Sequence, residues 1–148
     1  MIPQADARRL LMELLEREST LVLSTAGPHG APLFYVPAAG PTLYWLSSPA
    51  SRHSRALAGE VAVSIHAATF RWEAIRGAQL RGEASAVEDA DERALVLRAY
   101  RERFSLGDSF DAVIARSALY RFTPRWARYL DNALGFPGRV EIDFAAGA

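Results

Sequence analysis

The densest group of polar side chains in this sequence lies in residues 46–57, LSSPASRHSRAL, which begin inside the apolar run TLYWL. The segment holds four serines, two arginines and one histidine. Ser51 is a typical capping residue for the start of a helix, where the first backbone N–H groups have no partner within the helix. Hydroxyl groups, guanidinium groups and free N–H groups at the positive end of a helix dipole all favour an anion. The segment therefore predicts a site for a phosphate monoester.

The candidate phosphate ligands come from both sides of this predicted junction between a strand and a helix. Strand alternation turns Ser47 away from Leu46. The helix side contributes Ser48, Ser51, Arg52, His53 and Ser54. Arg52 offers a charged fork, and His53 adds a donor when it is protonated, a state that a neighbouring dianion favours. The plain alternative is that the serines only cap a short helix and the arginines are solvated surface. The segment alone leaves both interpretations open.

Composition removes several other kinds of chemistry. All 17 basic residues are arginine, and the chain has no cysteine. A Schiff-base lysine, a phosphate-loop lysine, a thiol nucleophile, a thiolate metal site and a disulfide are therefore excluded. The basic residues balance 17 acidic ones, so no overall field favours nucleic acid or an anionic membrane. We expect neither as a partner.

The remaining motif classes are also unsupported. His29 and His66 have no second ligand at metal-binding spacing, so we expect no metal site. No nucleophile elbow, dinucleotide fingerprint or phosphate loop is present. The charged, amphipathic N-terminus is unlike a signal peptide, and no apolar run approaches the roughly 20 residues of a membrane span. We expect a soluble, cytoplasmic protein with a single domain over residues 1–148.

Hydrophobic periodicity indicates the elements that must position the polar segment. It predicts a helix over residues 5–18, strands over 20–26, 31–38 and 42–48, and a short helix from Ser51 to Ala58. Strands follow over 60–67 and 74–87, the latter containing Gly77 and Gly82. Glycines inside a strand indicate a bulge, a barrel corner or the close approach of a ligand. Short spacers between the strands predict hairpins and an antiparallel sheet.

The second half of the chain adds helices and returns to strands. Asp89 and Glu92 predict a capped helix over 89–103, and a shorter helix is expected over 108–117. The strands LYRFT, RWARYLD and RVEIDF follow, the last after the loop NALGFPG. Six or seven short antiparallel strands with a few peripheral helices make a small β-barrel of the α+β class.

The order and spacing of several blocks resemble the pyridoxamine 5′-phosphate oxidase-like family of FMN-binding split barrels. These blocks are LVLSTAGPHGAPLFYV, LYWLSSPASRHSRAL, VAVSIH and IRGAQLRGEA, and they span most of the chain. YLDNALGF resembles an Asp-Asn-x-x-Gly-Phe segment of one branch of small proteins in that family. The resemblance implies an α+β split β-barrel with six to seven antiparallel strands.

The resemblance also implies which residues hold the cofactor. The FMN phosphate would be bound by Ser47 and by the basic pair Arg52 and His53, with a hydroxyl or backbone donor from Ser51. The family often has Arg-Lys where this chain has Arg-His, which makes phosphate binding sensitive to pH because histidine loses its charge near neutrality.

The flavin ring is implied to lie along two strands. Its pyrimidine edge would face Phe34, Tyr35 and Val36, with Leu46 and Ser47 on the adjoining strand. Gln79, which shares a strand face with Arg81, would reach the ring oxygens or the N5 region; a glutamine among small apolar residues also needs a polar partner. Core packing is the alternative for Phe34 and Tyr35.

Proteins of this family are homodimers with FMN in the cleft between the subunits. Trp126, Asn132 and Phe136 would then come from the second chain or line the mouth of the cleft. Aromatic residues are enriched at interfaces, which agrees with this placement of Trp126 and Phe136.

The function implied is an FMN-dependent oxidoreductase acting on a small molecule. The flavin carries the electrons, so no catalytic side chain is identified. Oxidation of pyridoxamine phosphate itself is not implied, because the context of the C-terminal arginines does not match. Two alternatives stay open: a flavin carrier or sensor without enzymatic activity, and a split barrel that binds deazaflavin or haem, where haem would need His53 or His66 as its axial ligand.

Overall fold

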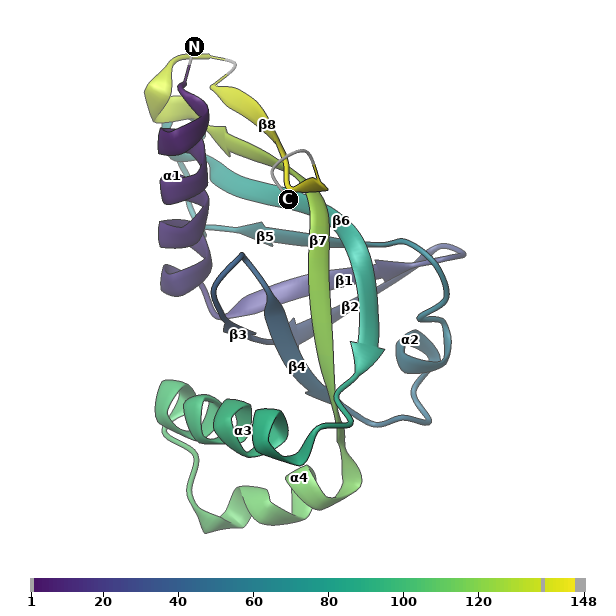
Figure 1. The fold of residues 1–148 in the computed structure, drawn as a ribbon. Coiled ribbons are helices and arrows are strands. Elements are labelled where there is room, and N and C mark those ends of the chain that lie inside the picture. Colours follow the sequence, from purple (N-terminus) through teal and green to yellow (C-terminus); the bar gives the residue numbers. More distant parts are fainter. Residues whose placement is uncertain (1, 137, 146–148) are drawn as a thin grey trace.

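A strongly curled antiparallel sheet with helices around it forms the protein (Figure 1). The computed structural model describes residues 2–136 and 138–145. Its strands are β1 Thr20–Thr25, β2 His29–Phe34, β3 Val36–Pro37, β4 Leu43–Ser47, β5 Val61–His66, β6 Arg76–Ala86, β7 Ala118–Asp131 and β8 Arg139–Asp143. Its helices are α1 Gln4–Arg17, α2 Arg52–Arg55, α3 Ala90–Phe104 and α4 Asp111–Arg116, with short 3₁₀ turns η1 Trp72–Ala74, η2 Asp108–Phe110 and η3 Asn132–Leu134. The expected α+β split barrel is confirmed.

The long strand β7 organises the sheet. Seven strands follow one another in the order β2-β1-β5-β6-β7-β4-β3, and β8 pairs with β7 outside this path. One edge of β7 pairs with β6, while its other edge is shared: β4 pairs with residues 118–122 and β8 with residues 126–130. The sequence pattern predicted two strands here, LYRFT and RWARYLD, and the structure corrects this to one. Pro124, which cannot donate to a ladder, lies beside the register shift at Arg81/Gly82, so the strand continues through it.

The structure explains why a glycine, Gly82, interrupts the sequence pattern of β6. A Cβ atom on Gly82 would lie 2.1 Å from the backbone oxygen of Thr123 and 2.7 Å from the Cα of Pro124. Of the three expected causes, the structure shows a bulge, with the backbone of β7 in close approach.

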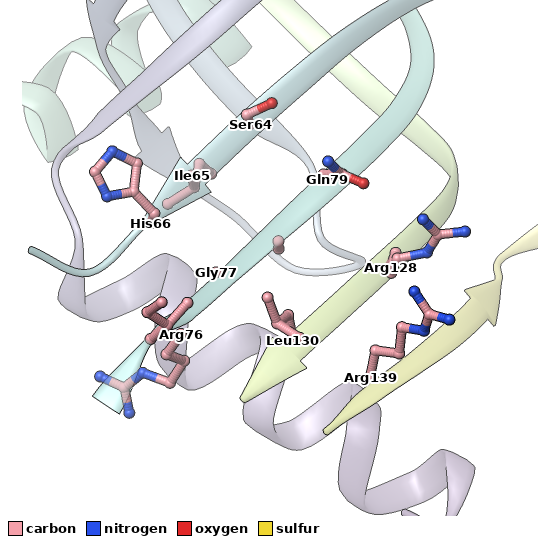
Figure 2. Close-up of a pocket in the computed structure, with 11 residues that line it drawn as sticks. Ser64, Ile65, His66, Arg76, Gly77, Gln79, Arg128, Leu130 and Arg139 are labelled. Carbon is pink, nitrogen blue, oxygen red and sulfur yellow. The ribbon is translucent and has the colours of Figure 1, made fainter. Parts of the chain in front are cut away.

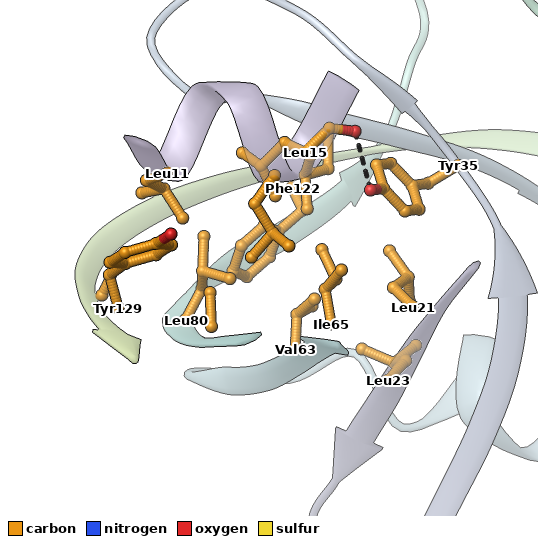
Figure 3. Packing of buried hydrophobic residues seen from close by; sticks show 14 of the residues in the cluster. Leu11, Leu15, Leu21, Leu23, Tyr35, Val63, Ile65, Leu80, Phe122 and Tyr129 are labelled. Carbon is orange, nitrogen blue, oxygen red and sulfur yellow. Dashed lines mark hydrogen bonds between the residues drawn. The ribbon is translucent and has the colours of Figure 1, made fainter. Parts of the chain in front are cut away.

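Alternate side chains of the strands fill the interior of the barrel (Figure 3). In β1, for example, exposed and buried residues alternate strictly. Helix α1 closes one side, with Leu11 and Leu15 in the same core cluster as Leu80 and Phe122. The fully buried Tyr35 donates a hydrogen bond of 2.8 Å from its hydroxyl to the backbone oxygen of Leu15. This bond ties the end of α1 to the sheet.

Helix α3 is held against the sheet by a polar contact. Asp89 caps the helix by accepting from the backbone N–H of Glu92 at 2.7 Å, as the sequence predicted. The Glu92 carboxylate accepts from the hydroxyl of Tyr44 at 2.8 Å and from Arg121 at 2.5 and 2.7 Å. Across residues 2–136 and 138–145, none of the helices combines the length and the apolar character that crossing a membrane requires.

Candidate functional site

A serine–histidine cluster forms where β4 passes into α2. We use this name for Ser47, Ser51, Arg52, His53 and Ser54. The Nε2 atom of His53 lies 2.5 Å from the Oγ atom of Ser47 and 3.2 Å from the Oγ atom of Ser51. The Ser51 hydroxyl also donates to the Ser54 hydroxyl at 2.7 Å. The structure therefore brings Ser47, Ser51, His53 and Ser54 together in one hydrogen-bonded group, to which Arg52 makes no hydrogen bond.

Local backbone structure positions these side chains. Ser47 is the last residue of β4 and pairs with Ala118 of β7. Ser51 caps α2 by accepting from the backbone N–H of Ser54 at 3.3 Å, and its hydroxyl lies 2.8 Å from the backbone oxygen of Ser48. The capping role is thus present, and it holds the Ser51 hydroxyl in the middle of the cluster.

The charge of the cluster depends on two basic residues. His53 is half-buried, and its pKa is lowered by burial and by the nearby His29, whose ring stacks on it at 6.3 Å. Arg52 is exposed and reaches the turn between β1 and β2, where its Nη2 atom lies 3.9 Å from the place that a Cβ on Gly27 would take. No ion pair joins Arg52 to a carboxylate among the described residues. The cluster therefore combines an unpaired cation, several hydroxyls and a histidine that is easily left neutral.

A second group of predicted residues lies on the outer face of the sheet. The guanidinium carbon of Arg81 lies 4.2 Å from the ring centre of Trp126, and that of Arg128 lies 5.4 Å from it. Glu141 accepts from Arg128 at 2.7 Å, and this contact is the main cause of the lowered pKa of Glu141. Gln79 is exposed, so burial does not force it to find a partner. Gln79 is instead a candidate ligand because it lines a pocket on this face of the sheet.

Gln79 and Arg128 line a pocket of about 340 Å³ on this face (Figure 2). Other polar and apolar residues of β5, β6, β7 and β8 complete it, among them Ser64, His66, Arg76, Leu130 and Arg139. No member of the serine–histidine cluster lines it. A single chain therefore carries the two groups of predicted ligands in separate places.

The residues predicted along the flavin edge have different surroundings. Tyr35 and Val36 are buried, and the side chain of Tyr35 packs in the core, as the alternative interpretation held. Phe34 is 56% exposed and stacks on Phe104 at 4.7 Å. Leu46 is half-buried. Tyr35 can offer a ligand only its backbone, whereas Phe34 presents a side chain.

The loop after β7 holds Asn132 and Phe136 beside η1. The side-chain amide of Asn132 donates to the backbone oxygen of Trp72 at 2.8 Å, and its backbone N–H donates to Ile75 at 3.0 Å. Phe136 meets the ring of Trp72 edge-on at 6.0 Å. Asn132 therefore joins the two loops, while Phe136 lies open on their surface.

Several residues of these sites were not predicted, among them His29, Arg76 and Arg139. His29 contacts His53 only because the turn between β1 and β2 lies against α2, and Arg76 and Arg139 line the same pocket only because β6 and β8 flank opposite edges of β7. No local pattern signals these neighbours. Within residues 2–136 and 138–145, no three histidine, aspartate or glutamate side chains are grouped in a way that could hold a metal ion.

The sequence matches one protein family over most of its length. The model of the family described as pyridoxamine 5′-phosphate oxidase matches residues 7–128. The chain belongs to this family. No curated protein matches the chain.

Solved structures of other proteins share the family fold. The conserved hypothetical protein Rv2991 of Mycobacterium tuberculosis is 18% identical, with a TM-score of 0.72 over 90% of this chain and 87% of that one. HutZ, a haem storage protein of Vibrio cholerae, is 22% identical, with a TM-score of 0.66 over 80% and 89%. A haem-binding protein of Mycobacterium smegmatis is 17% identical, with a TM-score of 0.74 over 99% of this chain and 60% of that one. At these identities the likeness concerns the fold alone.

Proposed function

We propose that the chain binds FMN and acts as an FMN-dependent oxidoreductase on a small molecule. The observation that carries this proposal is the serine–histidine cluster, in which hydroxyls and His53 converge at the end of β4, next to Arg52, a cation without a carboxylate partner among the described residues. Such a donor set fits a phosphate monoester, and the chain belongs to a family described by an oxidase of a phosphate ester. Bound FMN would supply the transfer of electrons.

Each residue of the cluster has a distinct role in this proposal. Arg52 gives the phosphate a charged fork, and the hydroxyls of Ser47 and Ser51 turn from each other and from His53 to donate to phosphate oxygens. His53 takes up a proton beside the dianion, because an opposite charge favours its charged form. In this exchange the hydroxyls of Ser47 and Ser51 gain phosphate oxygens as hydrogen-bond partners.

A homodimer completes the site in this proposal. In one chain the pocket that contains Gln79 is separate from the cluster, so a second copy is needed to bring an outer sheet face to the cluster. Trp126, whose ring is contacted by the guanidinium groups of Arg81 and Arg128, is then an aromatic contact for the flavin or for the partner. Phe136 and the loop held by Asn132 form the rim.

The test compares two ligands that differ only in the phosphate. Arg52→Ala should weaken FMN binding by about 1.5 kcal/mol, the lower end for a charged hydrogen bond because Arg52 is exposed. Riboflavin affinity should stay the same. Arg55→Ala removes an exposed arginine of the same helix and serves as the control. Equal losses for both ligands would show that Arg52 does not bind the phosphate.

A second measurement separates an enzyme from a flavin carrier. The FMN-loaded protein is mixed with NADH or NADPH, and bleaching of the flavin absorbance reports its reduction. Reoxidation by a series of small acceptors then reports turnover. A flavin that is reduced but passes its electrons to none of them favours the carrier.

Haem binding is a second candidate function. His66, one of the two histidines considered as axial ligands, lines the outer-face pocket together with Arg76, Arg128 and Arg139. An imidazole beside guanidinium groups fits an iron porphyrin with its carboxylates. A Soret band that His66→Phe removes would support haem held by His66; absence of any Soret band after haem is added would refute haem binding, and an unchanged band in the variant would refute His66 as the ligand.

A further inference from the structure

The outer-face pocket carries an excess of positive charge. Arg76, Arg128 and Arg139 line it, and its lining contains no aspartate or glutamate. Glu141, beyond the lining, pairs with Arg128 at 2.7 Å. Within residues 2–136 and 138–145, neither Arg76 nor Arg139 forms an ion pair. The pocket therefore favours a ligand that carries a negative charge.

The strand register brings two of these cations together. Arg128 pairs with Glu141, and Leu130 pairs with Arg139, so Arg139 lies diagonally next to Arg128 across β7 and β8. Figure 2 shows the two guanidinium groups on the same side of the pocket, with Arg76 on the other side of Leu130. Like charges on neighbouring strands repel each other. An anion bound between them removes that repulsion.

Apolar residues also lie in the pocket and in the grooves beside it. Leu130 and Ile75 line it. Arg139 also lines a neighbouring groove with Leu134 and Phe136, and Ile75 lines another with Phe70. Of these apolar residues, those outside β7 are all exposed, Phe136 to 76% and Phe70 fully; they are Phe70, Ile75, Leu134 and Phe136. A ligand whose acidic group lies at the arginines thus has apolar surface on either side for its body.

We propose that this pocket binds the substrate, and that the substrate is an organic acid with a flat apolar body. Arg139 and Arg128 hold its carboxylate or other anionic group, and Ile75 and Leu130 contact the body. Gln79 lies in the same pocket, which places the substrate beside the residue proposed to face the flavin. The assignment as a substrate rests on the proposed function; the preference for an apolar acid rests on the pocket itself.

The test uses 1-naphthoate and its neutral analogue 1-naphthamide as probes. Ligand-observed NMR gives the dissociation constant of each for the full chain. We expect 1-naphthoate to bind the unaltered protein more tightly, and Arg139→Gln to weaken it about five- to tenfold, the loss of one charged contact partly screened by water. 1-Naphthamide should bind both proteins equally. Arg125→Gln, which alters an exposed arginine of β7 outside the pocket, should leave both constants unchanged.

Three outcomes overturn the proposal: no binding of 1-naphthoate, equal binding of the two probes, or equal loss of both in Arg139→Gln. FMN affinity, measured on the same samples, separates the two proposals. If FMN does not bind but the naphthoate result holds, the proposed function fails and the acid pocket stands without its role as a substrate site.

Discussion

Gly82 offers the sharpest test of the sheet geometry. Its substitution by alanine adds one methyl group at the bulge between β6 and β7. The new Cβ atom would lie 2.1 Å from the backbone oxygen of Thr123 and 2.7 Å from the Cα of Pro124. These are backbone atoms, so no side-chain rotation can relieve the contact.

The size of the effect follows from these distances. Even a weak C–H···O contact keeps carbon and oxygen about 3.3 Å apart, so one of two paired strands must move by about 1 Å. The movement breaks ladder hydrogen bonds in the centre of the sheet. Overpacking in a core usually costs about 1–3 kcal/mol, and a clash with fixed backbone exceeds that range. We expect Gly82→Ala to lower the free energy of unfolding by about 4 kcal/mol or more.

Urea unfolding, followed by tryptophan fluorescence and circular dichroism, measures this loss. Gly107→Ala is the matched control: nothing lies within 4 Å of its Cβ position, so its stability should stay the same or rise by about 0.4–1 kcal/mol. A Gly82→Ala protein that is already unfolded without urea agrees with the prediction. A loss below about 1 kcal/mol, or one equal to that of Gly107→Ala, refutes the bulge geometry.

Two further predictions concern pH. Arg121 and Tyr44 lower the pKa of Glu92 from its ordinary 4.5, so the contact stabilises the fold above that pH and is lost as pH falls through the lowered pKa. Glu92→Gln should therefore cost about 1 kcal/mol in urea unfolding at pH 7 and progressively less as pH falls below 4.5, whereas Glu102→Gln, on the exposed side of α3, should cost little throughout this range. The pKa of His53 is lowered in the free protein and would be raised by a bound dianion, so FMN binding takes up a proton. Fluorescence titrations should show FMN affinity falling as pH rises above the lowered pKa of His53 in the free protein, riboflavin affinity staying constant, and the slope disappearing in His53→Asn; a slope kept in that variant contradicts the role of His53.

The elements that sequence patterns predicted well are those with local signals. Ser51 and Asp89 begin their helices as expected, because a capping side chain bonds to an N–H group only three residues away. Alternation located β1 and β5 for the same reason. The cluster around Ser47 was also predictable, since its members lie within eight consecutive positions.

What escaped prediction depends on contacts between distant parts of the chain. Arg139 reaches the pocket through its pairing opposite Leu130, and no residue near it in the sequence reveals that partner. The sequence alone left open whether the side chain of Tyr35 faces a ligand or the core. Its hydrogen bond to Leu15 of α1, which is distant in the sequence, shows that it faces the core. Pro124 normally ends a strand, and only the bulge at Gly82 lets β7 run past it.

The sharing of one edge of β7 by β4 and β8 has a consequence for how the binding properties of this chain can change. Ser47 lies opposite Ala118 and Arg139 opposite Leu130, so the single continuous strand β7 sets the spacing of the two sites within a chain. Sliding β7 by one residue would turn its side chains to the wrong face, and sliding it by two would displace everything by about 6.6 Å. Sequence changes that fit the protein to ligands of another size are therefore confined to the η1 and η3 loops, because the register of β7 fixes the distance between the two sites.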